Sequence, residues 1–136
     1  MFELTKKTEY GLQLMVYLAR NFSQEPVSLK QIVKVKKLPY RFLSQTATDL
    51  KKAGLIKSKE GAGGGYFLSR KPKEITVAKI LEVLEGPIGL VECLQKEASC
   101  PWSGMCGQRQ MFFRLKGIVK KVMESHSLAD LVGKEK

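Results

Sequence analysis

Apolar residues recur at three- and four-residue intervals over most of this chain, a pattern that predicts a mainly helical protein. The first helix is expected after Thr5, a residue that can cap it. It runs to about Asn21 with positions 11, 14, 15 and 18 on one inward face. A short second helix begins at Ser28, which forms the pattern of a capping box with Gln31, and ends near residues 36–37.

A third helix and a glycine-tipped hairpin follow. The helix starts at Leu38-Pro39, because proline suits a first helical turn, and stops at Gly54, which can adopt a left-handed conformation. Positions 42, 43, 46, 47 and 50 are expected to form its inner face. Residues 55–59 and 66–69 indicate two strands around the glycine-rich residues 61–65. This order is typical of a winged helix-turn-helix, whose second helix enters the major groove of DNA.

The remaining residues predict helices on both sides of a cysteine-containing loop. Thr76 caps a helix that ends at Gly86-Pro87, and the loop covers about residues 91–107. A longer helix spans residues 108–125 with apolar positions 111, 112, 115, 118, 119 and 122, and residues 127–132 form one more short helical turn. So wide an apolar face on an isolated helix predicts a dimer interface, with packing onto the same subunit as the alternative.

The fold class is therefore mainly α with a small β-wing, namely a winged helix-turn-helix plus a long C-terminal dimerisation helix. Charge supports a division within it. Residues 1–73 hold 15 Lys and Arg against 5 Asp and Glu, whereas residues 74–136 hold 9 against 8, in a chain of net charge +11. A one-sided positive charge is expected for contact with DNA phosphates, although solvated lysines are the alternative.

The outer side chains of the third helix are candidates for base contacts. Arg41 suits the acceptors of guanine, and Gln45 suits the edge of adenine. Lysines near them are expected to meet phosphates, which position the protein without specifying a sequence. The predicted residues that contact double-stranded DNA are Ser28, Lys30, Pro39, Tyr40, Arg41, Ser44, Gln45, Thr48, Lys51, Lys59, Gly64 and Tyr66.

Other function classes find little support in the chain. It holds one His and no pairing of a nucleophile with a base, so we expect no enzyme activity. The glycines of residues 61–65 lead into a strand and lack the Gly-Lys-Ser/Thr ending of a phosphate-binding loop. No apolar run approaches the roughly 20 residues that cross a bilayer, and the first residues show no signal-peptide pattern. We therefore expect a cytoplasmic protein without a membrane partner.

All three cysteines fall within one segment, at Cys93, Cys100 and Cys106. Their C-x6-C-x5-C spacing differs from the close pairs of zinc ribbons and thioredoxins, and it suits a loop around something larger than one ion. Iron–sulfur clusters are held mainly by thiolates, and three cysteines leave one position open. A three-cysteine zinc site, unliganded thiols and a thiol redox switch are the alternatives, and His126 is expected at the surface or as a cap rather than as a ligand.

These features together resemble the Rrf-type bacterial regulators, and within that family the iron–sulfur members IscR and NsrR. The resemblance covers nearly the whole chain and rests on the cysteines and on the following segments: Leu4-Thr5, Tyr10-Gly11, Gly54-Leu55, Gly63-Gly64-Gly65-Tyr66 and Ser127-Leu-Ala-Asp-Leu131. It implies a homodimer joined through a long C-terminal helix, near-palindromic operators, and a 2Fe–2S or 4Fe–4S cluster on the three cysteines. Residues 1–73 would then be the DNA-binding region, and residues 74–136 the cluster-binding loop and dimerisation helices.

The resemblance also implies a fourth cluster ligand. IscR-like members use a His three residues after the last Cys, but Arg109 occupies that position here and stays protonated. NsrR-like members use an acidic residue just before the Tyr-Gly of the first helix, provided by the partner subunit, which implies Glu9 in this chain. A charged residue favoured by the helix dipole is the alternative for Glu9.

Two departures from the family pattern stand out. The first cysteine gap has six residues rather than five, and Glu60 stands before the wing glycines where an Arg is frequent. We expect a regulator whose operator binding is controlled by a cluster that senses redox, nitric oxide or iron–sulfur status. A cysteine-thiol switch without a cluster is the second interpretation, and an iron–sulfur carrier or redox subunit is the third.

Overall fold

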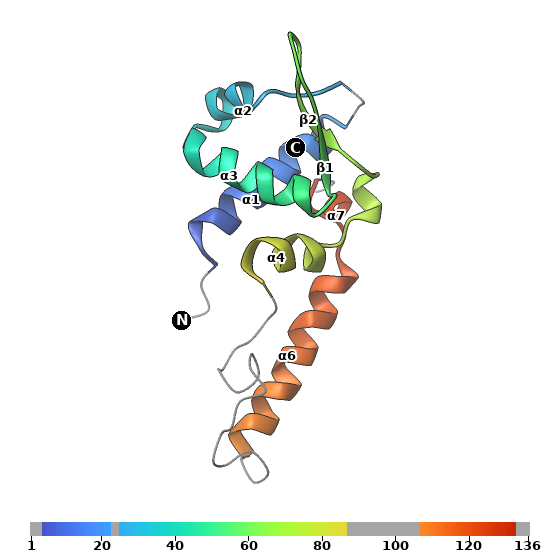
Figure 1. The fold of residues 1–136 in the computed structure, drawn as a ribbon. Coiled ribbons are helices and arrows are strands. Elements are labelled where there is room, and N and C mark those ends of the chain that lie inside the picture. The colour runs from blue at the N-terminus through green and yellow to red at the C-terminus, as the bar shows by residue number, and fades with distance from the viewer. Residues whose placement is uncertain (1–3, 23–24, 87–106, 133–136) are drawn as a thin grey trace.

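The computed structural model describes residues 4–22, 25–86 and 107–132 of the 136-residue chain (Figure 1). Within these residues it confirms the expected class, a mainly helical protein with one two-stranded antiparallel sheet. The elements in chain order are α1 (Lys6–Arg20), α2 (Leu29–Lys36), α3 (Tyr40–Lys52), β1 (Ile56–Lys59), β2 (Gly65–Leu68), the 3-10 helix η1 (Pro72–Glu74), α4 (Val77–Glu85), α6 (Gly107–Ser125) and α7 (Leu128–Val132).

Three of the helices begin at the side chains expected to cap them. The backbone N–H of Gln31 donates to Ser28 Oγ at 3.2 Å, which is one half of the expected capping box, and Thr5 and Thr76 accept equivalent bonds at the starts of α1 and α4. The side chain of Gln31 donates to the Tyr17 hydroxyl at 3.4 Å and so connects α2 to α1. Helix α3 has Pro39 as its N-cap and therefore begins one residue later than expected.

The core forms where α1 crosses α3 and α4. Gly11 lies at this crossing, where a Cβ atom would stand 2.5 Å from Leu84 Cδ1 and 2.7 Å from Thr46 Cγ2. Both distances are far shorter than a van der Waals contact, so the absence of a side chain at Gly11 lets the three helices approach. The inward face of α1 was predicted correctly, since the residues at positions 11, 14, 15 and 18 are all buried.

The predicted inner face of α3 is confirmed at four of its five positions. Leu43, Thr46, Ala47 and Leu50 are buried, but the prediction for Phe42 was wrong, since its side chain is 47 % exposed. Phe42 lies at the edge of the buried arc, and its ring packs beside that of Tyr10 on α1, with centroids 5.8 Å apart. A residue at the edge of an apolar arc is covered only as far as the neighbouring helix reaches.

A third segment joins the wing hairpin, which the sequence had not indicated. Strands β1 and β2 pair from Ile56 opposite Leu68 to Lys59 opposite Gly65. In addition, Val27 and Tyr66 exchange two backbone hydrogen bonds of 2.8 Å, so the residues before α2 pair with β2. A Cβ atom on Gly65 would stand 2.3 Å from the Val27 carbonyl oxygen, which explains why this close approach requires glycine.

The C-terminal helices lead from the far end of the molecule back to its core. Helix α6 projects downward as a long arm, while α7 lies back against the body near α1 (Figure 1). Leu128 of α7 is fully buried, and its backbone N–H donates to the Ile75 carbonyl at 2.8 Å. The core cluster thus includes Ile80, Leu84 and Leu128 beside residues of the first half, and the division at residue 73 stays a prediction.

Substitution of Gly65 tests whether the pairing of Val27 with Tyr66 anchors the wing to the residues before α2. We expect Gly65→Ala to lower the free energy of unfolding by about 1–3 kcal/mol, because the new methyl group collides with the backbone at Val27. Urea denaturation followed by circular dichroism measures the change. Gly117→Ala on α6 is the matched control, since nothing lies within 4 Å of its added Cβ, and it should leave stability unchanged or increase it. Equal effects of the two substitutions on the free energy of unfolding would contradict this role of the Val27–Tyr66 pairing.

Candidate nucleic-acid interface and cysteine segment

One face of α3 carries exposed hydrogen-bonding and cationic side chains. Arg41, Gln45, Thr48 and Lys52 follow one another at intervals of four, three and four residues and are all exposed. These intervals place them in one line along the outer side of the helix, opposite the buried residues. Lys51 and Lys52, both expected to meet phosphates, are exposed, and the intervals place Lys52 on this line and Lys51 beside it. The line has the composition that a recognition helix needs.

The other predicted residues near α2 and α3 have mixed surroundings. Tyr40 is 50 % exposed at the first turn of α3, and Lys30 is exposed on α2. Ser28 uses its hydroxyl to cap α2. Ser44 is half-buried, and its carbonyl accepts a 3.0 Å hydrogen bond from the Thr48 hydroxyl. Tyr40 and Lys30 are therefore free to reach outward, whereas Ser28 serves the helix start.

Two of the predicted wing residues have a structural reason to be where they are. A Cβ atom on Gly64 would stand 2.3 Å from the Lys59 carbonyl oxygen, so Gly64 is required by the turn. Tyr66 is half-buried and paired with Val27 through its backbone. Lys59 and Glu60 are exposed beside the turn. Of the expected wing contacts, Lys59 is the one whose side chain is fully available for phosphate.

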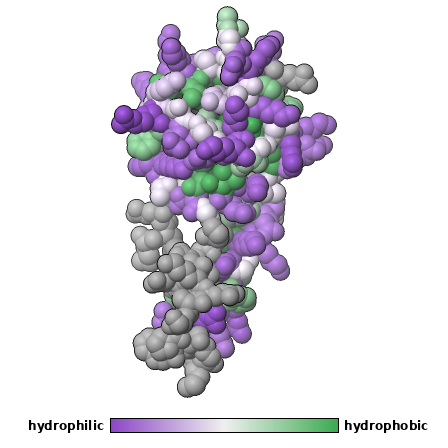
Figure 2. Space-filling model, in the orientation of Figure 1, coloured by the Kyte–Doolittle hydropathy of each residue, from purple (hydrophilic) through white to green (hydrophobic). Residues whose placement is uncertain are grey.

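The predicted DNA-contacting elements lie at one end of the molecule. In Figure 1, α2 and the tip of the hairpin lie in the upper part of the structure, and α6 extends from the opposite side. Figure 2 shows that hydrophilic side chains predominate over this upper part in the same orientation. Such a surface suits a hydrated, charged partner, and the arm formed by α6 points away from it.

A carboxylate connects the start of α1 to the end of α4. Glu85 Oε2 accepts hydrogen bonds of 2.5 Å from the hydroxyls of both Thr5 and Thr8, and Thr8 is fully buried. These bonds stabilise the ionised form and lower the pKa of Glu85, with burial acting weakly in the opposite direction. The chain passes from Glu85 through Gly86 toward the cysteine segment. The first turn of α1 is thereby held beside the C-terminal end of α4.

Glu9 lies on the same first turn of α1. Its side chain is 51 % exposed and pairs with Lys6 Nζ at 3.1 Å. Cys93, Cys100 and Cys106 lie outside the described residues, so their predicted roles stay predictions. Within the described ranges, no three His, Cys, Asp or Glu side chains come together as a metal site. His126 Nδ1 lies 2.9 Å from the Val122 carbonyl oxygen, as expected of a side chain that caps the end of a helix.

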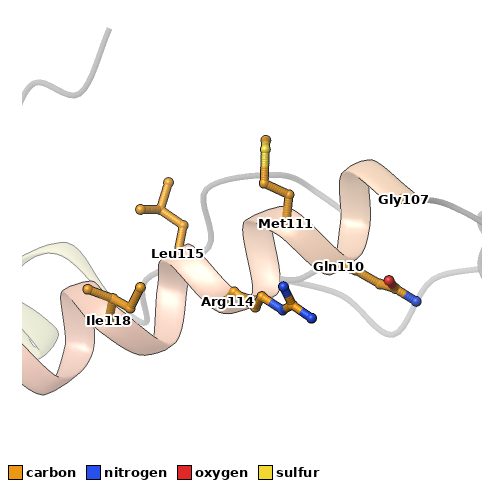
Figure 3. A pocket seen from close by; sticks show the side chains of 6 residues that line it. All are labelled: Gly107, Gln110, Met111, Arg114, Leu115 and Ile118. Atoms are coloured by element: carbon orange, nitrogen blue, oxygen red, sulfur yellow. The ribbon is translucent and has the colours of Figure 1, made fainter.

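Helix α6 presents an apolar face that its own subunit leaves exposed. No described residue of α6 is buried, and its exposed apolar side chains are Met111, Phe113, Ile118 and Val122. Figure 3 shows Met111 and Leu115 projecting from one side of the helix and Arg114 from another. A hollow of about 380 Å³ lies along it, lined by Gly107, Gln110, Met111, Arg114, Leu115 and Ile118.

Among the described helices, none is long and apolar enough to span a bilayer. A helix-turn-helix with a paired wing and an outward line of Arg, Gln, Thr and Lys defines a DNA-binding protein of the winged-helix class. The profile of the Rrf2 family, described as an iron-dependent transcriptional regulator, matches residues 4–134. The chain therefore belongs to the Rrf2 family of transcriptional regulators, which confirms the resemblance found in its motifs.

Individual relatives agree with this assignment. The transcriptional regulator CymR of Bacillus subtilis is 39 % identical over 129 residues, which cover 95 % of this chain and 88 % of CymR. NsrR of Shouchella clausii is 30 % identical over 131 residues, which cover 96 % of this chain and 88 % of NsrR.

Solved structures show the same fold. The structure of CymR, described as the global cysteine regulator of B. subtilis, superposes with a TM-score of 0.83 at 38 % identity, and both chains are covered completely. The structure of T. potens IscR gives a TM-score of 0.75 at 35 % identity, with 96 % of this chain and 86 % of IscR covered.

The Glu85 contact makes stability depend on pH in one direction. Because the folded-state pKa of Glu85 lies below its ordinary value of 4.5, the ionised carboxylate contributes stability that is fully present above pH 4.5 and is lost as the pH falls through the folded-state pKa. We expect Glu85→Gln to destabilise the protein at neutral pH. At a pH below the folded-state pKa of Glu85, the stability of the variant should differ less from that of the wild type. Urea denaturation at both pH values measures this, with the exposed Glu82→Gln on the same helix as control. A deficit that is equal at both pH values would contradict the assignment.

Proposed function

We propose that the protein is a homodimeric transcription regulator whose operator binding is controlled by an iron–sulfur cluster held by Cys93, Cys100 and Cys106. The observation that supports this most is the contact of Glu85 with Thr5 and Thr8. It joins the end of α4, which precedes the cysteine segment in the chain, to α1, and α1 packs against the recognition helix α3. We expect a change at the cysteines to reach the DNA-binding face through α4 and α1.

The DNA side of the proposal assigns a part to each element. Helix α3 enters the major groove with its outward line of side chains, and Arg41 and Gln45 contact base edges. The lysines contact phosphates, namely Lys30, Lys51, Lys52 and Lys59. The protein acts by binding rather than by catalysis, which agrees with the absence of a nucleophile–base pair in its sequence.

The donor set fits a cluster with one ligand from the partner. Three thiolates satisfy three positions of a 2Fe–2S or 4Fe–4S cluster, and a carboxylate completes the set. Glu9 provides such a carboxylate. Its ion pair with Lys6 lies at the surface, so giving up this pair to bind a cluster costs little free energy. When bound, the cluster supplies a centre that responds to redox state, nitric oxide or iron–sulfur status. The residues of this chain hold it and connect it to α1.

A second copy of the chain is the proposed occupant of the α6 face. Met111, Ile118 and Val122 are each more than half exposed, and burying them removes apolar surface from water. Their spacing of seven and four residues suits a helix-to-helix seam. Because α7 returns into the core, such a seam would join two DNA-binding units rigidly enough to set the distance between their recognition helices.

A thiol switch without a cluster is the second candidate. One observation favours it, namely the similarity to CymR, whose structure is described as that of a cysteine regulator. In this mechanism the thiols themselves are oxidised and reduced, and the same contact between Glu85 and α1 would carry the change. An iron–sulfur carrier is disfavoured, because the family is one of transcription regulators.

The visible spectrum of protein purified without oxygen separates the two candidates. We expect absorption bands together with stoichiometric iron and acid-labile sulfide, and Glu9→Ala should lower cluster retention while leaving the unfolding midpoint nearly unchanged. Lys6→Ala, on the same turn, is the matched control and should retain the cluster. A colourless protein that also resists anaerobic reconstitution would replace the cluster with the thiol switch.

Two substitutions distinguish base contacts from phosphate contacts. We expect Lys30→Ala to weaken binding to all DNA sequences and to reduce the slope of log affinity against log salt by about 0.9. Arg41→Ala should instead cost about 1–3 kcal/mol on the preferred operator and relax the preference at one base pair. Fluorescence anisotropy over a range of salt concentrations measures both, and identical behaviour of the two variants would contradict the proposed docking.

A further inference from the structure

Asp49 is the one acidic residue of α3, and its carboxylate contacts two other side chains. Its Oδ2 accepts from Lys7 Nζ of α1 at 2.5 Å. Its Oδ1 accepts from Gln45 Nε2, one helical turn earlier, at 3.5 Å. The two oxygens of one carboxylate thus connect a cation on α1 to the amide proposed to read a base.

The position of Asp49 requires a physical explanation. A carboxylate on a helix that approaches DNA is repelled by the phosphates, and α3 otherwise carries only neutral and basic side chains. The side chains of Lys7 and Asp49 are 35 % and 24 % exposed, so this ion pair is partly shielded from solvent. Lys7 therefore serves as the counter-ion that makes a carboxylate tolerable at this face, rather than as an additional phosphate contact.

The carboxylate fixes which end of the Gln45 side chain faces it. An ionised carboxylate accepts hydrogen bonds and donates none, so it orients the NH₂ group of Gln45 toward Asp49 and the carbonyl oxygen away. Adenine offers one donor and one acceptor in the major groove, which match a carbonyl and an N–H in a fixed order. Guanine offers two acceptors there, and the fixed carbonyl of Gln45 would oppose one of them. If the Gln45 amide is free to rotate, either its carbonyl or its NH₂ group can face a given base atom, and the preference for adenine over guanine is reduced.

We propose that Asp49, held by Lys7, is a specificity-determining positioning residue that orients the Gln45 side-chain amide to select adenine over guanine at one operator position. This inference depends on the proposed docking of α3 in the major groove. It adds to that docking a reason for the acidic residue on α3 and a role for Lys7 on α1.

The experiment compares base preferences of full-length proteins prepared without oxygen. The operator consensus of the wild type is first obtained by selection from a random double-stranded DNA library, and binding to every single-base variant of the selected site is then measured. We expect Asp49→Asn, which removes the charge and lets the amide face either way, to lower the adenine-over-guanine preference at one position about tenfold. Affinity for random-sequence DNA should stay the same or rise, because a negative charge is lost near the phosphates.

Three further variants show whether the effect passes through Gln45 and Lys7. Glu82→Gln changes the net charge equally at an exposed position of α4 and should leave all base preferences unchanged. In a Gln45→Ala background, Asp49→Asn should have no further effect on the preference. Lys7→Ala should weaken binding to all DNA in the wild type and lose most of that effect in the Asp49→Asn background, whereas a lysine that contacts phosphate would cost the same in both.

The outcomes separate this inference from the proposed docking. An Asp49→Asn protein with the wild-type base preferences and an unchanged unfolding midpoint would overturn the role of Asp49. A loss of preference of equal size in the Gln45→Ala background would do the same. If Gln45→Ala itself leaves every base preference unchanged, the proposed docking of α3 fails, and the role of Asp49 fails with it.

Discussion

The close crossing of α1 with α3 and α4 at Gly11 is the constraint on which the rest of the structure depends. A Cβ atom there would collide with the side chains of both Thr46 and Leu84, so these two buried residues pack directly against the backbone of α1 because position 11 is glycine. The recognition helix α3 and the helix α4 therefore meet on the same side of α1, next to Gly11. Because packed cores deform little, a shift of α3 or α4 against α1 displaces the other helix as well.

Polar contacts repeat this arrangement at the first turn of α1. Thr5 and Thr8 donate to Glu85 at the end of α4, and Lys7 pairs with Asp49 near the end of α3. A stretch of four residues thus contacts both the end of α4 and the DNA-facing helix α3. Glu9, the proposed cluster ligand, follows directly in the chain. The first turn of α1 is the place where sensing and DNA contact meet in the proposed mechanism.

The similarity to CymR bears on the DNA-binding fold, whereas the three cysteines bear on what the protein senses. CymR and this chain belong to one family and share one fold, and the TM-score of 0.83 shows that they share the DNA-binding architecture. What the thiols hold is a question of ligand chemistry rather than of fold, because the same winged helix serves either kind of sensor. The proposed mechanism through Glu85 and α1 is common to both candidates.

The chain itself determined the order and ends of the elements, because capping residues, Pro39 and Gly54 act locally, and hydrophobic spacing marks the inward faces. It also indicated Arg41 and Gln45 as outward residues and the cysteines as one group. Only the tertiary structure showed that Val27 joins the wing, that Phe42 stays exposed beside Tyr10, and that Lys7 and Glu85 reach across to other helices. Such pairings connect residues far apart in the chain, and no local periodicity or capping preference encodes which distant surface a side chain will meet.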